Sequence, residues 1–307
     1  TNPFRGASSA THPLLAESAT QFQATAFKEL LPAGGPVRTV IMGDETPEKY
    51  AKAGRVQEFM NFQLMNKMED FTPEYDQMLF YLPLAGSTFK KIYYDELMER
   101  PVSKFVPAED LVVNYLSTDL DNCERICHVI NMSYNDFRKK QVSGFYKDID
   151  ILPQETEENE VQKRYNELQG TRPSYADKVV KLYEFHTSID LKDFEDKDDS
   201  GEMTGIKIPY IVTIEEGSSQ VVGIRRNFEK DDPKKMKKQY FVQYKFLPGL
   251  GFYGFGLIHL IGGLSRTATD ILRQLLDAGT LSNLPAGFKS RGIRMRDDAD
   301  PLQPGEF

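Results

Sequence analysis

Residues 249–254 read GLGFYG and have the G-x-G-x-x-G spacing with which many enzymes hold the pyrophosphate of a dinucleotide. The preceding segment, 239–247, has the composition of a strand, and the following segment, 256–279, has that of a helix. Strand, glycine turn and helix form the context in which N–H groups at a helix N-terminus bind phosphate. The first chemistry that this pattern suggests is therefore nucleotide binding.

The dinucleotide fingerprint also needs an acidic residue at the end of the next strand, about 20 residues further on. The next acidic residues here, Asp270 and Asp277, fall inside the predicted helix, and no strand ending in Asp follows. We therefore expect a hinge between a sheet and a helix, where glycine allows positive φ and a close approach of backbones. The predicted hinge glycines are Gly249, Gly251, Gly254 and Gly256.

Two other patterns resemble metal sites without meeting their requirements. The segment DKDDSG (196–201) begins like a calcium loop, but position twelve is Lys207 where the loop needs a bidentate Glu. Cys123, Cys127 and His128 follow a C-x₃-C-H spacing that no common zinc site uses. On one strand the two thiols would lie about 13 Å apart, too far for a disulfide. With no hydrolase, zincin or P-loop motif present, we expect no metal, no cofactor and no enzyme activity.

Two basic clusters occur in the last third of the chain. Residues 229–240 contain five lysines and have the composition of a solvated loop. Residues 287–296 could form a solvated strand or contact the phosphate backbone of a nucleic acid, and the sequence leaves both readings open. The side chains for such a contact would be Lys289, Arg291, Arg294 and Arg296.

The composition is that of a globular protein, with 307 residues, of which 40% are hydrophobic and 27% charged. A net charge of −8 argues against a dedicated high-affinity nucleic-acid binder. The most apolar run, 252–264, is shorter than the roughly 20 residues that cross a bilayer. Only two cysteines are present, which favours a reducing compartment.

The spacing of apolar residues predicts runs of helices and runs of strands. Helices are predicted at 12–31, 46–70, after Pro73, and at 134–141, 157–168 and 256–279. Strands are predicted at 37–43, 89–96, 102–106, 110–115, 124–132, 178–190, 206–216, 220–228 and 239–247. Thr46 and Ser133 are expected to cap helices, and Gly217-Ser218-Ser219 to form a hairpin turn. Because no regular βαβ alternation appears, we expect an α+β fold.

The segment 256–279 is the most informative predicted helix. Its apolar face is broad and contains Leu257, Ile258, Leu260, Ile261, Leu264, Ala268, Ile271, Leu272 and Leu275. Four charged residues of alternating sign follow one another at spacings of 4, 3 and 4 and form one stripe. They are Arg266, Asp270, Arg273 and Asp277. Such a helix is either buried in a monomer or packed against a neighbouring subunit, and both remain open.

Several blocks in order along the chain are distinctive as strings. They are HPLLAESATQFQATAFKELLPAGGPVRT (12–39), YLPLAGSTFKKIYYD (81–95), VPAEDLVVNY (106–115), ERICHVINMS (124–133), NDFRKKQVSGFY (135–146) and KFLPGLGFYGFGLIHLIGGLSRTATDILRQLLDAGTLSNLPAGFKSRG (245–292). Together these blocks cover most of the chain and resemble the portal proteins of tailed bacteriophages, especially the larger portals of short-tailed phages. The joint string of glycine turn, helix and LSNLPAGF is the most specific part of the resemblance.

The resemblance implies a virion protein, assembled in the bacterial cytoplasm, that forms a ring of twelve subunits at one capsid vertex. Double-stranded DNA would pass through the channel during packaging and ejection. The implied partners are further copies of the chain, the major capsid protein, the terminase motor and the tail adaptor proteins. No membrane and no cofactor is implied, because ATP is hydrolysed by the separate motor.

The resemblance also implies a division of the chain into a wing (1–252), a stem helix (253–283) and the start of a clip (284–307). Residues 178–247 are a rival for the clip. No second stem helix, tunnel loop or crown has a counterpart, which favours a piece of a longer protein. Two other functions remain as alternatives: a nucleotide-binding enzyme that uses GLGFYG, and a membrane-surface or scaffold protein that uses 252–264.

Overall fold

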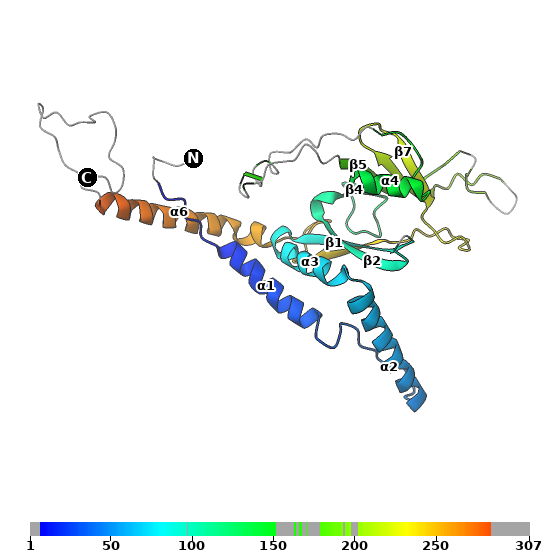
Figure 1. Ribbon diagram of the computed structural model, residues 1–307, viewed down its shortest axis with the longest axis horizontal. Helices are drawn as coiled ribbons and strands as arrows, with labels where there is room; N and C mark the ends of the chain where they lie inside the picture. The colour runs from blue at the N-terminus through cyan, green and yellow to red at the C-terminus, as the bar shows by residue number, and fades with distance from the viewer. Residues whose placement is uncertain are drawn as a thin grey trace, which may run out of the picture.

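The computed structural model describes residues 7–283 apart from 97, 152–162, 164–165, 168–169, 171–178, 193 and 198–201. The described part has an α+β fold with two antiparallel sheets, beside which α3 and α4 lie, while α1, α2 and α6 extend away from them (Figure 1). The fold class predicted from the sequence is therefore confirmed. Most of the predicted helix 157–168 and all of the basic segment 287–296 lie outside the described residues.

The described helices follow the predicted ones closely. They are α1 (Leu14–Leu30), α2 (Pro47–Phe62) with a π-helical turn (Gln63–Lys67), α3 (Phe71–Ala85), α4 (Tyr134–Val142) and α6 (Leu257–Asn283), with a 3₁₀ turn at Ala108–Asp110. Both predicted caps are present. The Thr46 hydroxyl accepts the N–H of Lys49, and the Ser133 hydroxyl accepts the N–H of Asp136 at 3.1 Å. These caps satisfy N–H groups that a helix start leaves unpaired.

The strands occur where alternation predicted them, with one exception, but they do not form sheets in sequence order. The first sheet, sheet A, has the order β2-β1-β8 and consists of β1 (Ser87–Asp95), β2 (Arg100–Pro107) and β8 (Phe241–Lys245). The second, sheet B, has the order β3-β4-β5-β6-β7 and consists of β3 (Leu111–Val113), β4 (Arg125–Ser133), β5 (Val179–Ile189), β6 (Ile208–Glu215) and β7 (Val221–Arg226). The predicted hairpin turn joins β6 to β7.

The main hydrophobic cluster joins the two sheets. Its buried members are Phe89, Val106, Leu111, Leu120, Cys123, Ile126, Phe241 and Phe252. A second cluster lies between α4 and sheet B and contains Phe137, Tyr146, Ile151, Val180, Leu182 and Val222. Because the first cluster draws on strands of both sheets, it holds sheet A and sheet B in one unit.

The predicted strand at 37–43 is wrong. This segment lies along α2, where side chains of the helix bind its backbone. The N–H of Val37 donates to Asn61 Oδ1 at 2.9 Å, and the Thr39 hydroxyl donates to the carbonyl of Ala53 at 3.1 Å. Alternation favours an extended backbone but does not supply a neighbouring strand, and within the described residues this segment has none.

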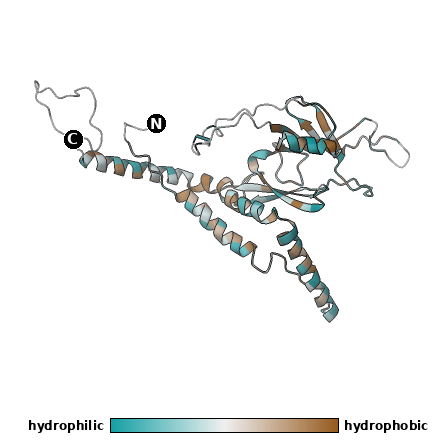
Figure 2. Ribbon diagram, viewed as in Figure 1, coloured by the Kyte–Doolittle hydropathy of each residue, from teal (hydrophilic) through white to brown (hydrophobic). Residues whose placement is uncertain are grey.

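Helix α2 forms an arm that projects away from the sheets (Figure 1). Its apolar residues, Tyr50 and Val56 among them, recur at helical spacing, yet none of its residues is buried. Phe59 is 60% exposed, and hydrophobic positions occur along the ribbon of the arm (Figure 2). The helical spacing was correct, but spacing cannot show whether the partner of an apolar face belongs to the same chain.

Candidate functional site

The glycine turn connects sheet A to α6 through backbones in close contact. A Cβ atom on Gly256 would lie 2.3 Å from the carbonyl oxygen of Leu84 and 2.6 Å from the nitrogen of Gly86. A Cβ atom on Gly254 would lie 2.5 Å from the carbonyl oxygen of Leu247. Distances this short exclude any side chain at these positions. The close approach predicted for the glycines is thus confirmed at Gly254 and Gly256, and also at Gly249, whose Cβ would lie 2.0 Å from the Tyr253 carbonyl oxygen.

Three N–H groups between the end of the turn and the start of α6 are already used within the chain. Gly254 N–H donates to Ser87 Oγ at 2.7 Å, Phe255 N–H to the Leu247 carbonyl at 2.9 Å, and Gly256 N–H to His259 Nδ1 at 3.1 Å. A pyrophosphate cradle needs such donors free and needs space above the glycines. Here neighbouring backbone fills the space at Gly249, Gly254 and Gly256, and protein atoms accept the hydrogen bonds of residues 254–256, so this end of the turn has the geometry of a structural junction.

Two expectations about the glycines need correction. None of Gly249, Gly251, Gly254 and Gly256 has positive φ; the residue that does is Gly86, at +84°, where α3 ends. Gly251 has no atom within 4 Å of a Cβ position and contributes no close contact. The turn is also packed against the hydrophobic core, because Phe252 is buried and stacks on Phe89 with ring centroids 5.8 Å apart.

An N-terminal strap, residues 8–12, runs along α6 and is held by polar side chains of that helix. Ser8 N–H donates to Asp277 Oδ1 at 2.7 Å, and Arg273 Nε donates to the carbonyl of Ala10 at 2.7 Å. His12 N–H donates to the Thr269 hydroxyl at 3.2 Å. The strap therefore covers one face of α6 with hydrogen bonds.

The predicted stripe of four charges on α6 is divided between two roles. Arg273 and Asp277 bind the strap, whereas Arg266 is exposed and Asp270 is exposed beside it. Within the part of the chain that the structure describes, no ion pair joins any two of these four residues. Interface roles therefore remain open for Arg266 and Asp270, while Arg273 and Asp277 already have partners.

The apolar residues of α6 form a second stripe, and this one faces solvent. Leu264 is 67% exposed and Leu275 66% exposed, with Leu260 and Ile271 on the same side of the helix. The buried residues of α6 are instead Ser265 and Thr269, on the face that the strap covers. Exposed apolar residues in a continuous row mark a binding surface more often than isolated ones do. We call Leu260, Leu264, Ile271 and Leu275 the α6 stripe.

A buried ionic cluster lies where sheet A meets sheet B. Lys91 Nζ on β1 and His186 Nε2 on β5 lie 2.5 Å and 2.8 Å from the same Glu184 oxygen. Burial alone would raise the pKa of Glu184, but the Lys91 ammonium and the His186 hydrogen bond outweigh it and hold the pKa below its ordinary value. Lys91 Nζ also lies 3.4 Å from His128 Nδ1. No pattern in the sequence predicted this cluster.

His128 is expected to make folding sensitive to acid. Burial, and then the nearby Lys91 charge, lower the pKa of His128 to about 3, against about 6.5 for an unfolded chain. The unfolded chain therefore takes up a proton first, and stability is lost as the pH falls from about 6.5 towards 3. At pH 4 the loss from this residue would reach about 3 kcal/mol. Urea titrations at pH 7 and pH 4 measure it, and an equal pH effect in His128→Gln would contradict it.

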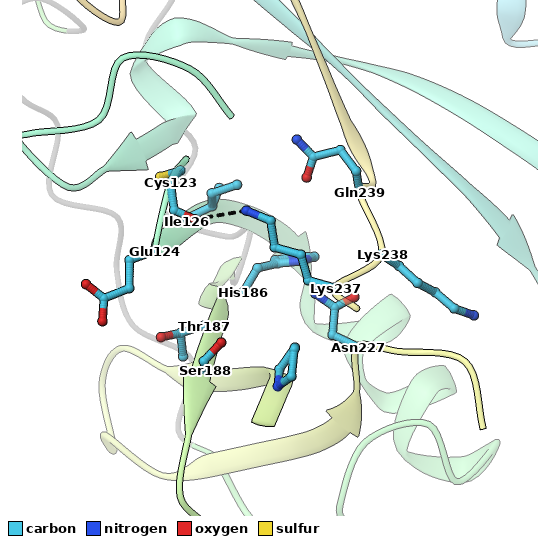
Figure 3. Close-up of a pocket in the computed structure, with 11 residues that line it drawn as sticks. Cys123, Glu124, Ile126, His186, Thr187, Ser188, Asn227, Lys237, Lys238 and Gln239 are labelled. Carbon is cyan, nitrogen blue, oxygen red and sulfur yellow. Dashed lines mark hydrogen bonds between the residues drawn. The ribbon is translucent and has the colours of Figure 1, made fainter. Parts of the chain in front are cut away.

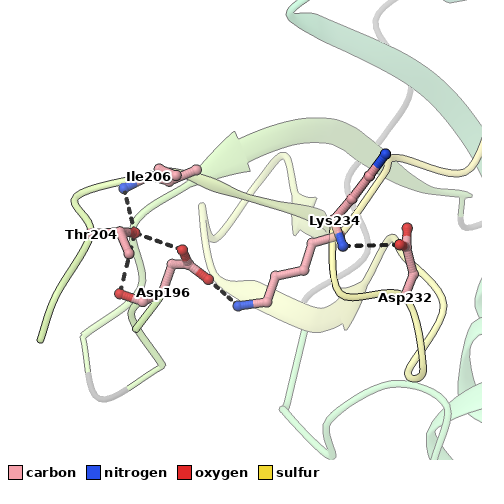
Figure 4. A network of polar contacts seen from close by, with 6 residues as sticks. Asp196, Thr204, Ile206, Asp232 and Lys234 are labelled. Carbon is pink, nitrogen blue, oxygen red and sulfur yellow. Dashed lines mark hydrogen bonds and ion pairs between the residues drawn. The ribbon is translucent and has the colours of Figure 1, made fainter. Parts of the chain in front are cut away.

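The remaining candidate sites are satisfied by the chain's own groups. Asp196, from the calcium-like segment, pairs with Lys235 and accepts the Thr204 hydroxyl at 2.6 Å (Figure 4). In the lysine-rich segment, Lys237 Nζ donates to the backbone carbonyls of Leu120 and Asp121 and to that of Cys123, the last of which is drawn in Figure 3. These lysines were expected to be solvated, and two of them instead anchor their loop.

The cavity beside Lys237 is small. It has a volume of about 20 Å³, room for one water molecule, and is bordered by Cys123, His186 and Asn227 (Figure 3). Cys123 and Cys127 are both free and buried. In the described residues, no three His, Cys, Asp or Glu side chains are grouped so as to hold a metal ion.

Neither a family model nor a curated protein sequence matches the chain. Among the described helices, none has the length and apolar character needed to cross a bilayer. The geometry thus points to two features with functional potential: the glycine junction with α6, and the exposed α6 stripe. Gly86 belongs to this junction and was missed, although a glycine directly after an apolar helix is a recognisable C-terminal signal.

Proposed function

We propose that the chain is a subunit of a phage portal, a ring through which double-stranded DNA enters and leaves the capsid. In this proposal the sheets and α1–α4 form the wing, and α6 is the stem helix that packs against its neighbours around the channel. Terminase, tail adaptors and the major capsid protein would bind the assembled ring.

The observation that supports this proposal most directly is the α6 stripe. An isolated chain would expose four large aliphatic side chains on one side of a 27-residue helix whose other side is covered by the strap. Burying an aliphatic side chain contributes about 1.5–3 kcal/mol relative to leaving it in water. A neighbouring copy of α6 would provide that burial.

The α2 arm supports a ring rather than a two-fold dimer. It exposes a separate apolar surface that includes Val56, Phe59 and Met60, on a different element from the α6 stripe. A head-to-tail interface joins two different patches of each subunit, and repeated rotation closes it into a ring. Two distinct unpartnered surfaces on one chain fit that arrangement.

Substitution within the α6 stripe is expected to prevent assembly. Leu264→Glu or Ile271→Glu would place a carboxylate in the subunit interface, where burying an unpaired charge is costly. We expect a shift from rings to monomers with an unchanged circular dichroism spectrum. Analytical ultracentrifugation and negative-stain imaging of the full-length protein would measure it.

Thr280→Glu is the matched control, because it adds the same carboxylate at an exposed position on the opposite side of α6 from the stripe. It should assemble as the unchanged protein does. If the unchanged full-length protein forms only compact monomers, or if Leu264→Glu assembles normally, the proposed function is wrong.

A further inference from the structure

Several positive side chains lie around the Lys91–Glu184 pair, where sheet A meets sheet B. On sheet A, Lys91 of β1 and Lys104 of β2 are direct cross-strand partners and so lie on the same face. Like charges directly opposite each other destabilise a sheet pair. Lys91 is neutralised by Glu184, but that carboxylate is shared with His186, and Lys104 has no such partner.

From the other side, α4 and β7 contribute two more cations around one aromatic ring. The Arg225 guanidinium carbon lies 3.7 Å from the centroid of the Phe145 ring, and Lys140 Nζ lies 4.9 Å from the same centroid. Stacking on a ring fixes the plane of a guanidinium group and leaves its N–H edge available. Two cations are thus held in place by an uncharged group.

These side chains have no counter-ion of their own. Within the described residues, none of Lys104, Lys140 and Arg225 joins an ion pair, and the buried Nε of Arg225 has no hydrogen-bond partner. A buried charged donor without an acceptor costs more than a neutral one. At the Arg225 Nε the arrangement is therefore unfavourable unless something else supplies the acceptor, whereas Lys104 is exposed to water.

The charges here influence one another. The pKa of Lys140 lies below its ordinary value, first because of burial, with Asp95 acting in the opposite direction and Lys91, Lys104 and Arg225 lowering it further. Lys91, Lys104 and Arg225 thus act on Lys140 with charges of the same sign, and Asp95 acts against them. This repulsion is local, because the chain as a whole carries −8.

We propose that Arg225, Lys140 and Lys104 form a binding site for a phosphate group. Arg225 would donate from β7 through its guanidinium group, Lys140 would donate from α4, and the exposed Lys104 would approach from sheet A. A tetrahedral dianion matches both this group of positive charges and the fork of guanidinium donors, and charge-assisted hydrogen bonds of this kind are strong. The site lies between the sheets, far in sequence from α6, and does not depend on ring assembly.

The sequence provides matched control residues for the test. Arg225 and Arg226 are neighbours on β7 with side chains on opposite faces of the sheet, and Lys139 and Lys140 are neighbours on α4. Binding of inorganic phosphate is measured by calorimetry at constant ionic strength, with chloride as the balancing anion. Arg225→Gln and Lys140→Gln should each weaken binding at least tenfold, whereas Arg226→Gln and Lys139→Gln should leave it within twofold.

Thermal unfolding gives an independent measurement. A ligand that binds only the folded protein raises the midpoint with its concentration, so phosphate should stabilise Arg226→Gln but not Arg225→Gln. Absence of phosphate binding, or equal loss in Arg225→Gln and Arg226→Gln, would overturn the proposal. If Arg225→Gln does not fold, the lysine pair decides by the same criterion.

Competition identifies the source of the phosphate group. A nucleoside monophosphate and a short duplex DNA are each titrated against bound inorganic phosphate. Displacement by the monophosphate alone supports a site for small phosphates or phosphomonoesters. Displacement by duplex DNA that is lost in Arg225→Gln supports a backbone phosphate. DNA binding that is identical in all four variants counts against the site.

Discussion

Gly256→Ala is expected to lower the free energy of unfolding by about 3 kcal/mol or more, at the upper end of what overpacking costs. The new Cβ would lie 2.3 Å from the Leu84 carbonyl oxygen and 2.6 Å from the Gly86 nitrogen, and both are backbone atoms. Backbone cannot rotate away as a side chain can, so the end of α3 or the start of α6 must shift. Chemical denaturation followed by circular dichroism would measure the loss.

Gly251→Ala is the control, from the same set of four hinge glycines. No atom lies within 4 Å of its Cβ position and its φ is not in the left-handed region, so stability should be unchanged or slightly higher. A nucleotide cradle would in addition lose ligand binding in this variant, because its second glycine must let the backbone approach the pyrophosphate. Equal destabilisation by the two substitutions would contradict the packing explanation.

Glu184→Leu is expected to lower the free energy of unfolding by about 3–5 kcal/mol, the usual effect of removing one partner from a buried ion pair. The side chains of Lys91 and Glu184 are only 12% and 8% exposed. Without the carboxylate, Lys91 would remain as a buried ammonium beside the Phe241 ring, and His186 would lose its hydrogen-bond partner.

Two further variants test whether the unpaired buried charge causes this loss of stability. The double substitution Lys91→Met with Glu184→Leu removes both charges and should recover most of the lost stability. Glu216→Gln breaks the half-exposed pair of Lys181 and Glu216, where water screens the charges, and should cost less than about 1 kcal/mol. If the double variant is no more stable than Glu184→Leu, the buried charge is not the source of the effect.

The positively charged residues show what local composition can and cannot predict. Composition alone made residues 229–240 a solvated loop, yet Lys237 binds three backbone carbonyls and Lys235 pairs with Asp196. Lys104, Lys140 and Arg225, which join no ion pair with any described residue, come from three elements distant in sequence. A cluster of this kind has no sequence signature, because it exists only once two sheets have met.

The sequence by itself determined where most of the helices and strands lie. Apolar spacing located α1, α3, α4 and α6 and eight strands, and short-range chemistry located the caps at Thr46 and Ser133. Each of these features depends on residues a few positions apart, and such interactions need no contact with a distant segment. The segment 37–43 shows the limit, since an extended segment needs a neighbouring strand to become part of a sheet.

Only the tertiary structure decided which strands pair, what the glycines contact and which way α6 faces. β8 follows β7 in sequence but pairs with β1, because Phe241 and Phe89 are buried in the same cluster. Gly254 and Gly256 are required by the backbone of Leu84 and Gly86, more than 160 residues earlier, as the 167-residue span from Ser87 to Gly254 shows. The α6 stripe faces outward because the buried face of the helix is the one that contains Ser265 and Thr269. Each outcome depends on contacts between distant segments, which periodicity along the chain does not encode.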